Sequence, residues 1–226
     1  KKQLFFKIFK MSSEGRFTRG EEIANFVSHL VGASLGVIGL VLLIVFAAIK
    51  GTAWHIVSVT VFGTTIILLY LSSTLYHGLK HGKAKRVFFL FDQIAIYLLI
   101  AGSYTPIALL GVKGTLGWVM FGIEWGLAIL GIVFRSVFQN DYKKGVHPLQ
   151  VTAFIVMGWL ALIAIEPLKK FLPDVGLGLL FAGGCFYTFG VIFFAFKKMK
   201  YNHFIWHLFV IAGTLCHYIL VFKYLL

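Results

Sequence analysis

Seven long apolar stretches constrain this chain more than any other feature. A helix that crosses a bilayer needs about 20 predominantly apolar residues, because every backbone amide must be paired inside the segment that crosses. The stretches that meet this length are 27–49, 56–79, 87–111, 116–134, 148–167, 175–196 and 204–225. The predicted fold class is therefore an all-α integral membrane protein, a bundle of seven transmembrane helices.

The composition supports a membrane protein and argues against a nucleic-acid partner. Hydrophobic residues make up 59% of the 226 residues and charged residues only 13%, whereas soluble domains average roughly 45–50% and about 25%. The net charge of +13 is spread in short basic groups between the apolar runs. Nucleic-acid binding needs those residues on one solvated patch, so no nucleic-acid partner is expected.

The distribution of Lys and Arg predicts the orientation in the membrane. Segments on the side of the N-terminus carry 16 of these residues and those on the other side carry 5; without the lysines before Met11, an alternative start, the first number is 12. Basic residues collect on the cytoplasmic side. We therefore expect a multi-pass plasma-membrane protein with a cytoplasmic N-terminus and an outside C-terminus. Residues 1–20 are predicted to form a basic cytoplasmic segment and 21–226 the membrane domain.

That orientation brings several polar residues to one depth, near the cytoplasmic ends of the spans. Ionisable groups at membrane depth are costly and usually mark a functional site. The residues concerned are Glu22, Asn25, His29, Ser73, His77, Asp92, His203 and His207.

Three of these residues suit a zinc ion. His203 and His207 are four residues apart and lie on one helix face, and His77 can complete a three-histidine set. Such a set leaves the fourth zinc position open to water, which the metal activates as a nucleophile. Asp92 can orient that water or accept its proton, and the Ser73 hydroxyl can hydrogen-bond the water or a substrate carbonyl.

A simpler interpretation stays open for the same residues. HxxxH alone is a weak motif, and histidines are common at membrane interfaces because the ring has an apolar body and a polar tip. Glu22, Asn25 and His29 are expected to support the site rather than to bind the metal. His217, about 15 Å beyond His207 along a helix, is too distant to share the ion and is expected to hydrogen-bond a neighbour.

Two residues elsewhere in the spans carry separate predictions. Glu124, in the middle of the fourth span, is expected to be protonated and bonded to a backbone or hydroxyl group, with a proton site as the alternative. Pro106 is expected to kink the third span, because it lacks a backbone donor and clashes one turn back. Gly32 and Gly36 form a GxxxG pattern expected to pack helices closely.

Four segments taken together resemble one family. They are E-x-x-N-x-x-x-H from Glu22 to His29, S-x-x-x-H from Ser73 to His77, FDQIAIYLLIAGSYTP around Asp92, and HFIWHLFVIAGTLCHY from His203. From about Gly20 to its end, the chain resembles the bacterial hemolysin III family. That family belongs to the progestin and adipoQ receptor superfamily, which includes the adiponectin receptors.

The resemblance implies a zinc ion held by His77, His203 and His207, with Asp92 and Ser73 holding the bound water. In the adiponectin receptor branch such a site is associated with ceramidase-type amide hydrolysis, and the bacterial branch is linked to membrane-lipid homeostasis. The leading hypothesis is thus a zinc-dependent hydrolase with membrane lipids as substrates. The alternatives are a non-enzymatic sensor or receptor with a structural zinc, and a transport or membrane-permeabilising protein of the hemolysin type.

Overall fold

The computed structural model describes residues 17–138 and 146–226, and within these ranges the chain is helical and has no strand. Seven helical segments are long and apolar enough to cross a membrane, which confirms the predicted fold class. Most of the predicted basic segment, residues 1–20, and Met11 with it, lie outside the described residues. The segments are α2 (Arg19–Lys50), α3 (Ala53–Gly78), α4 (Lys83–Pro106) with η1 (Ile107–Val112), α5 (Gly114–Val133) with η2 (Phe134–Phe138), α6 (Pro148–Gly158) with η4 (Leu160–Ala164) and α7 (Ile165–Phe171), α8 (Asp174–Ala195), and α9 (Asn202–Leu220) with η5 (Val221–Leu225).

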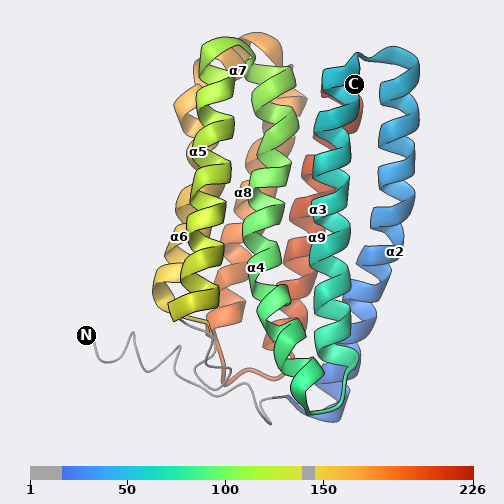
Figure 1. Cartoon of the computed structure of the whole chain (residues 1–226), viewed down its shortest axis with the longest axis vertical. Helices are drawn as coiled ribbons and strands as arrows, with labels where there is room; N and C mark the ends of the chain where they lie inside the picture. The colour runs from blue at the N-terminus through green and yellow to red at the C-terminus, as the bar shows by residue number, and fades with distance from the viewer. Residues whose placement is uncertain (1–16, 139–145) are drawn as a thin grey trace.

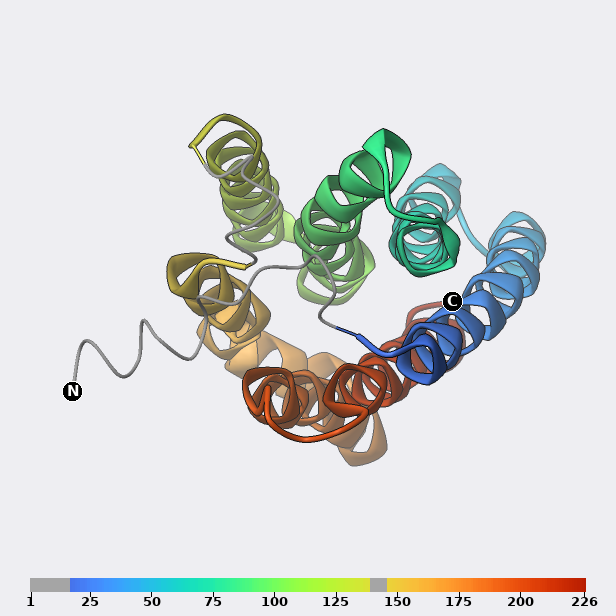
Figure 2. The same cartoon turned by 90° about the horizontal axis from the view of Figure 1, so that it is seen from below.

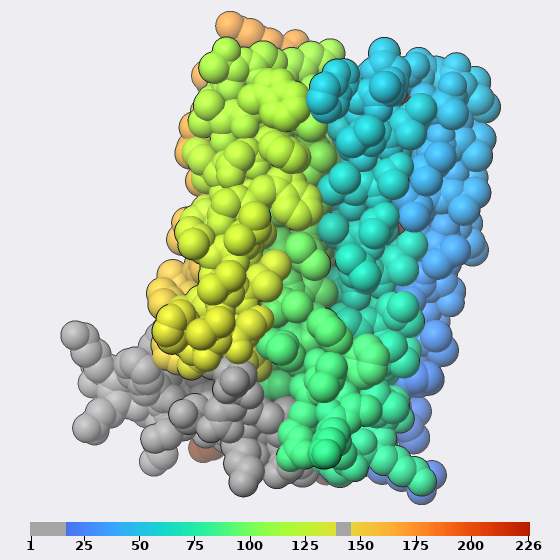
Figure 3. Space-filling view, viewed as in Figure 1, coloured from blue at the N-terminus to red at the C-terminus, as the bar shows by residue number. Residues whose placement is uncertain are grey.

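The helices run side by side along the long axis of the molecule (Figure 1), and the end view shows α4 nearest the middle of the bundle (Figure 2). Neighbours in sequence pack together, and α9 also packs against α2. The third span is the most enclosed, with 72% of its most apolar window buried, against 22% for α2. On the face shown in Figure 3, α5, α4, α3 and α2 lie next to one another, with α2 at the edge. Since only 22% of its most apolar window is buried, α2 presents most of its surface outward. Lipid-facing helices of this kind expose apolar side chains, as α2 does along its whole length.

The first helix begins at Arg19, eight residues before the predicted apolar stretch. Thr18 and Glu21 form a reciprocal cap: the Thr18 backbone N–H donates to Glu21 Oε2 at 2.8 Å, and the Glu21 backbone N–H donates to Thr18 Oγ1 at 3.3 Å. This capping box satisfies donors that the first turn of a helix leaves without partners. Another oxygen of Glu21 accepts the Tyr201 backbone N–H at 2.9 Å, so the start of α2 is tied to the start of α9.

The fifth span is interrupted where α6 ends at Gly158. The Tyr104 hydroxyl donates to the Gly158 carbonyl at 3.0 Å and accepts the Ala161 backbone N–H at 2.7 Å. Backbone groups freed inside a membrane must find another partner in the protein, and Tyr104 supplies it from α4. Directly after Pro106 the third span changes from α-helical to wider π-helical turns, a distortion at the residue where a kink was expected.

Small residues allow close helix contacts. An added Cβ at Gly32 would meet the Tyr70 ring at 3.0 Å, and one at Gly36 would meet Ile66 Cγ2 at 3.0 Å. Both glycines therefore lie in the interface between α2 and α3, which is the packing role expected of the GxxxG pattern.

Two glycines of α5 provide a test of this packing. A Cβ at Gly117 would clash with the backbone carbonyl oxygen of Ala108, which cannot rotate away, whereas a Cβ at Gly122 meets nothing within 4 Å. We expect Gly117→Ala to lower the free energy of unfolding by about 1–3 kcal/mol, and Gly122→Ala to leave it unchanged or slightly higher. Thermal unfolding in detergent measures both. Equal melting temperatures for the two variants would contradict this packing.

Candidate metal centre

Three histidines from two helices meet at one end of the bundle. His77 closes α3, and His203 and His207 open α9. One ring nitrogen of each lies within 4.8 Å of the others, and all three residues are buried, with exposed fractions of 4%, 8% and 1% respectively. His77, which is 126 positions before His203 in the chain, therefore forms one compact donor set with His203 and His207, as the predicted depths indicated.

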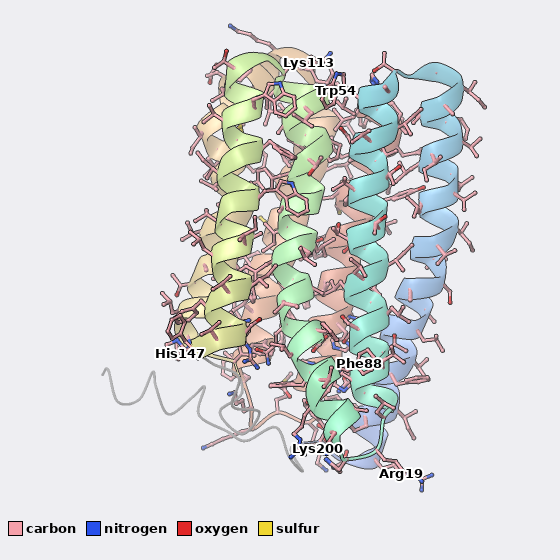
Figure 4. All side chains as sticks on the ribbon, in the orientation of Figure 1. Arg19, Trp54, Phe88, Lys113, His147 and Lys200 are labelled. Atoms are coloured by element: carbon pink, nitrogen blue, oxygen red, sulfur yellow. The ribbon has the colours of Figure 1, made fainter. Side chains whose placement is uncertain are left out.

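This end of the bundle is the one where α2 begins. Arg19 and Lys200 mark it in Figure 4, and Trp54 and Lys113 mark the opposite end. The histidine cluster thus lies at the end of the bundle whose connecting segments carry most of the Lys and Arg residues.

The His77 ring is held by a carboxylate. Its Nδ1 lies 2.6 Å from Glu22 Oε2, and since a carboxylate only accepts hydrogen bonds, Nδ1 carries the proton. The Nε2 atom then has its lone pair available, and it has no hydrogen-bond partner among the residues that the structure describes. A carboxylate that orients a histidine through the far ring nitrogen is the usual support of a metal ligand.

The His207 ring is held by a hydroxyl. Its Nδ1 lies 3.0 Å from Ser28 Oγ, and that hydroxyl donates its proton to the Asn25 carbonyl at 2.9 Å. Because the hydroxyl has one proton, Nδ1 of His207 must be the donor, which leaves Nε2 as the atom with the lone pair. His29 stacks on the same ring, with the centroids 3.4 Å apart and the planes 8° from parallel.

The helix α2 supplies most of this support. Glu22 accepts the proton of His77 Nδ1, and His29 stacks on His207. The Asn25 amide nitrogen lies 3.5 Å from the same His77 Nδ1, a packing contact between two donors. These side chains are three and four residues apart and share one helix face. The residues expected to support the site are therefore all brought to it.

Asp92 and Ser73 lie beside the histidines. The Asp92 carboxylate, from α4, is within electrostatic range of His77 and adjacent to the Ser73 hydroxyl. Ser73 is fully buried, and its hydroxyl makes no hydrogen bond of standard geometry within the described residues. Asp92 also lines the same cavity as His203 and His207. The arrangement joins a carboxylate, a hydroxyl and three imidazoles around one space.

Sequence reasoning missed two residues of this site. Lys85 is only 2% exposed, and its ammonium group donates to Glu22 Oε1 at 2.9 Å and to the Tyr76 carbonyl at 2.8 Å. Nothing in the sequence separates it from the other basic residues of its loop. Ser28 had a signal, since it lies three residues after Asn25 on the polar face of α2.

A second space lies deeper in the bundle. It is next to the space beside Asp92, because both are lined by four apolar side chains, Ile96, Phe154, Val191 and Trp206, and it extends to His217. Its mostly apolar lining suits a hydrocarbon chain.

Two predictions about polar residues deeper in the bundle have opposite outcomes. His217 Nε2 lies 3.2 Å from the Leu180 carbonyl, so its expected hydrogen bond is confirmed. The expected bond of Glu124 is wrong: neither carboxyl oxygen has a partner within the described part of the chain, although the residue is fully buried. The Tyr104 hydroxyl near Glu124 already bonds Gly158 and Ala161, so it has no proton left to donate.

Fold and site together define a multi-pass membrane protein with a three-histidine cluster between its second and seventh spans. The chain belongs to the haemolysin III family: residues 17–218 match the family described as "Haemolysin-III related". It is 46% identical to the Hemolysin-3 homolog of Bacillus subtilis (strain 168) over 208 residues, which cover 92% of this chain and 96% of the relative. It is 44% identical to Hemolysin-3 of Bacillus cereus over 217 residues, which cover 96% and 97%.

A more distant match extends to animals. The chain is 26% identical over 228 residues to the human Monocyte to macrophage differentiation factor, covering 97% of this chain and 92% of that protein. The family and the wider superfamily that the sequence motifs resemble are thereby confirmed.

The ion pair of Glu22 and Lys85 predicts the cost of losing the carboxylate. Glu22→Ala leaves the buried Lys85 ammonium without an anion, which for fully buried pairs costs about 3–5 kcal/mol. Because the Glu22 side chain is 22% exposed, we expect about 2 kcal/mol, measured as a loss of unfolding free energy in detergent. The matched control is Glu166→Ala, which breaks an exposed pair with Lys169 and should cost under about 1 kcal/mol. Similar losses for both variants would refute the buried ion pair.

Proposed function

We propose that this protein is a zinc-dependent membrane hydrolase that cleaves an amide or ester bond of a lipid. The observation that carries the proposal is the buried cluster of His77, His203 and His207, two of which, His203 and His207, line one cavity with the Asp92 carboxylate. A metal-ligand set and a proton acceptor that open onto an apolar cavity are the parts that hydrolysis of a lipid requires.

The donor set fits zinc. Neutral imidazoles are preferred zinc ligands, and the hydrogen bonds to Glu22 and Ser28 turn the Nε2 lone pairs of His77 and His207 away from the supporting residues. A buried Nε2 with no partner among the described residues, as in His77, is costly unless it binds something. His77, His203 and His207 would hold the ion, and zinc, when bound, supplies a Lewis acid and an activated water.

The remaining residues have roles that follow from their positions. Asp92 accepts a proton from the nucleophile and then returns it to the leaving amine or alcohol. The Ser73 hydroxyl donates a hydrogen bond to the carbonyl oxygen of the substrate, where negative charge develops. The mostly apolar space next to the one beside Asp92 holds the acyl chain and limits the entry of water. Lipids would enter from the leaflet nearest the cluster.

Metal content and activity test this proposal together. We expect about one zinc per purified chain, lost in His203→Ala/His207→Ala, because two of three ligands are removed. Asp92→Asn should keep the zinc but lower hydrolysis of an N-acyl sphingoid lipid or an ester lipid by at least ~100-fold, the minimum expected for a general base. Elemental analysis and product detection by mass spectrometry provide the readouts. Zinc-loaded wild type that hydrolyses neither lipid class would sink the hydrolase proposal.

A second candidate is a non-enzymatic sensor in which zinc is structural. The observation in its favour is that the cluster joins the end of α3 to the start of α9, so an ion there would clamp two distant segments. This candidate predicts that His207→Ala lowers the melting temperature while Asp92→Asn leaves cellular function intact. The hydrolase proposal predicts the reverse for Asp92→Asn.

We also propose that the cluster lies on the cytoplasmic side, supported by the distribution of Lys and Arg. Thr52 and Lys198 are exposed and lie in the connections at opposite ends of the bundle. In a background with Cys185 and Cys216 replaced by Ser, Thr52→Cys should react with a membrane-impermeant maleimide on intact cells. Lys198→Cys should react only after permeabilisation. The opposite labelling pattern would place the cluster outside.

A further inference from the structure

A buried arginine lies outside the histidine cluster and has no acidic partner among the residues that the structure describes. Arg135, in η2, is 1% exposed. Its Nε donates to Gln93 Oε1, and its Cζ lies 5.5 Å from the centre of the Phe89 ring. No carboxylate pairs with it in the described ranges, and its Nη1 has no hydrogen-bond partner there. The guanidinium charge is therefore only partly compensated.

Two buried glutamines add donors near this arginine. Gln93 bonds Arg135 directly, and since arginine has no acceptor, the Gln93 oxygen faces Arg135 and its amide nitrogen is left without a partner among the described residues. Gln150 is 1% exposed, and neither polar atom of its side chain has a partner there. It lines a groove together with Phe134, the residue before Arg135. Buried polar groups are normally hydrogen-bonded, so the unpaired donors of Arg135 and Gln93 indicate a missing acceptor with negative charge.

An apolar groove near Arg135 indicates what kind of molecule carries such an anion. Gln150 borders an outward-facing apolar groove of about 350 Å³ between α5 and α6, together with Tyr97, Leu130 and Val156. Tyr97 is also within electrostatic range of Arg135. Leu130 and Val156 are 66% and 54% exposed, as is usual for residues that face lipid. The groove thus has the Gln150 amide in its wall, and Tyr97 connects that wall to Arg135.

We propose that Arg135, Gln93 and Gln150 bind the phosphate of an anionic phospholipid whose acyl chain lies in the groove between α5 and α6. The planar guanidinium matches phosphate oxygens and supplies the countercharge, and the two amides donate further hydrogen bonds. Gln93 also lines the cavity that contains Asp92 and His207, so the headgroup sits next to the histidine cluster. The site does not depend on whether that cluster binds zinc or catalyses hydrolysis.

Lipid-dependent stabilisation tests the proposal. The full chain in detergent is titrated with phosphatidylglycerol, phosphatidylcholine or inorganic phosphate, and the melting temperature is recorded. We expect phosphatidylglycerol to raise it and phosphatidylcholine to have little effect. Arg135→Gln should weaken the apparent affinity for phosphatidylglycerol at least tenfold. Arg86→Gln, which removes an exposed charge at the same end of the bundle, should keep the wild-type affinity.

A second variant keeps the test valid if Arg135→Gln fails to fold. Gln150→Leu removes an amide that makes no hydrogen bond within the described residues, so it should fold at least as well without lipid. It should nevertheless bind phosphatidylglycerol more weakly. Zinc content, measured in parallel, should be unchanged in both variants.

The contrary outcomes are distinct. Equal effects of both lipids on wild type, or full protection of Arg135→Gln and Gln150→Leu by phosphatidylglycerol, would overturn the site. Protection by inorganic phosphate as strong as that by phosphatidylglycerol would overturn the lipid as its source and leave a site for free phosphate.

Discussion

Hydrocarbon offers no hydrogen-bond partner, so each polar group at that depth must find its partner inside the protein. This constraint explains why the described chain is helical throughout and why its one interrupted span is repaired by a side chain, the Tyr104 hydroxyl at Gly158 and Ala161. It also explains why ionisable residues gather at one end, where α2, α3, α4 and α9 enclose them. In that arrangement the single Glu22 carboxylate accepts hydrogen bonds from both His77 and Lys85.

Exceptions to the constraint are informative because they are costly. A buried polar group without a partner costs about 1–3 kcal/mol, and the described residues contain two groups of such atoms at the same end of the bundle. One includes His77 Nε2 at the histidine cluster; the other includes Arg135 Nη1 and the Gln93 amide nitrogen. The group at the histidine cluster has a free lone pair, so it suits a cation. The group at Arg135 has N–H donors without an acceptor, so it suits an anion. Both lie beside the cavity that holds Asp92, to which Gln93 also contributes.

The sequence predicted the spans and the histidine cluster because both depend on local pattern and depth alone. Apolar length locates each helix, and helix direction then sets the level of His77 against His203. The start of α2 was missed although Thr18 and Glu21 carry the spacing of a capping box. The pattern of apolar residues does not show which helices face each other. The burial of Lys85 and Arg135 and the interruption at Gly158 depend on those contacts, so the sequence did not predict them. The expected hydrogen bond of Glu124 was wrong for the same reason. The sequence does not show that the nearby Tyr104 hydroxyl already donates its proton to Gly158.

The proposed zinc site has three imidazole ligands and one open position. X-ray absorption at the zinc edge of the purified, zinc-loaded protein measures the ligands directly. We expect three imidazole nitrogens at about 2.0–2.1 Å and one further oxygen or nitrogen atom at a similar distance. A closed four-histidine shell, sulfur ligands at about 2.3 Å, or the same spectrum in His203→Ala/His207→Ala would contradict it.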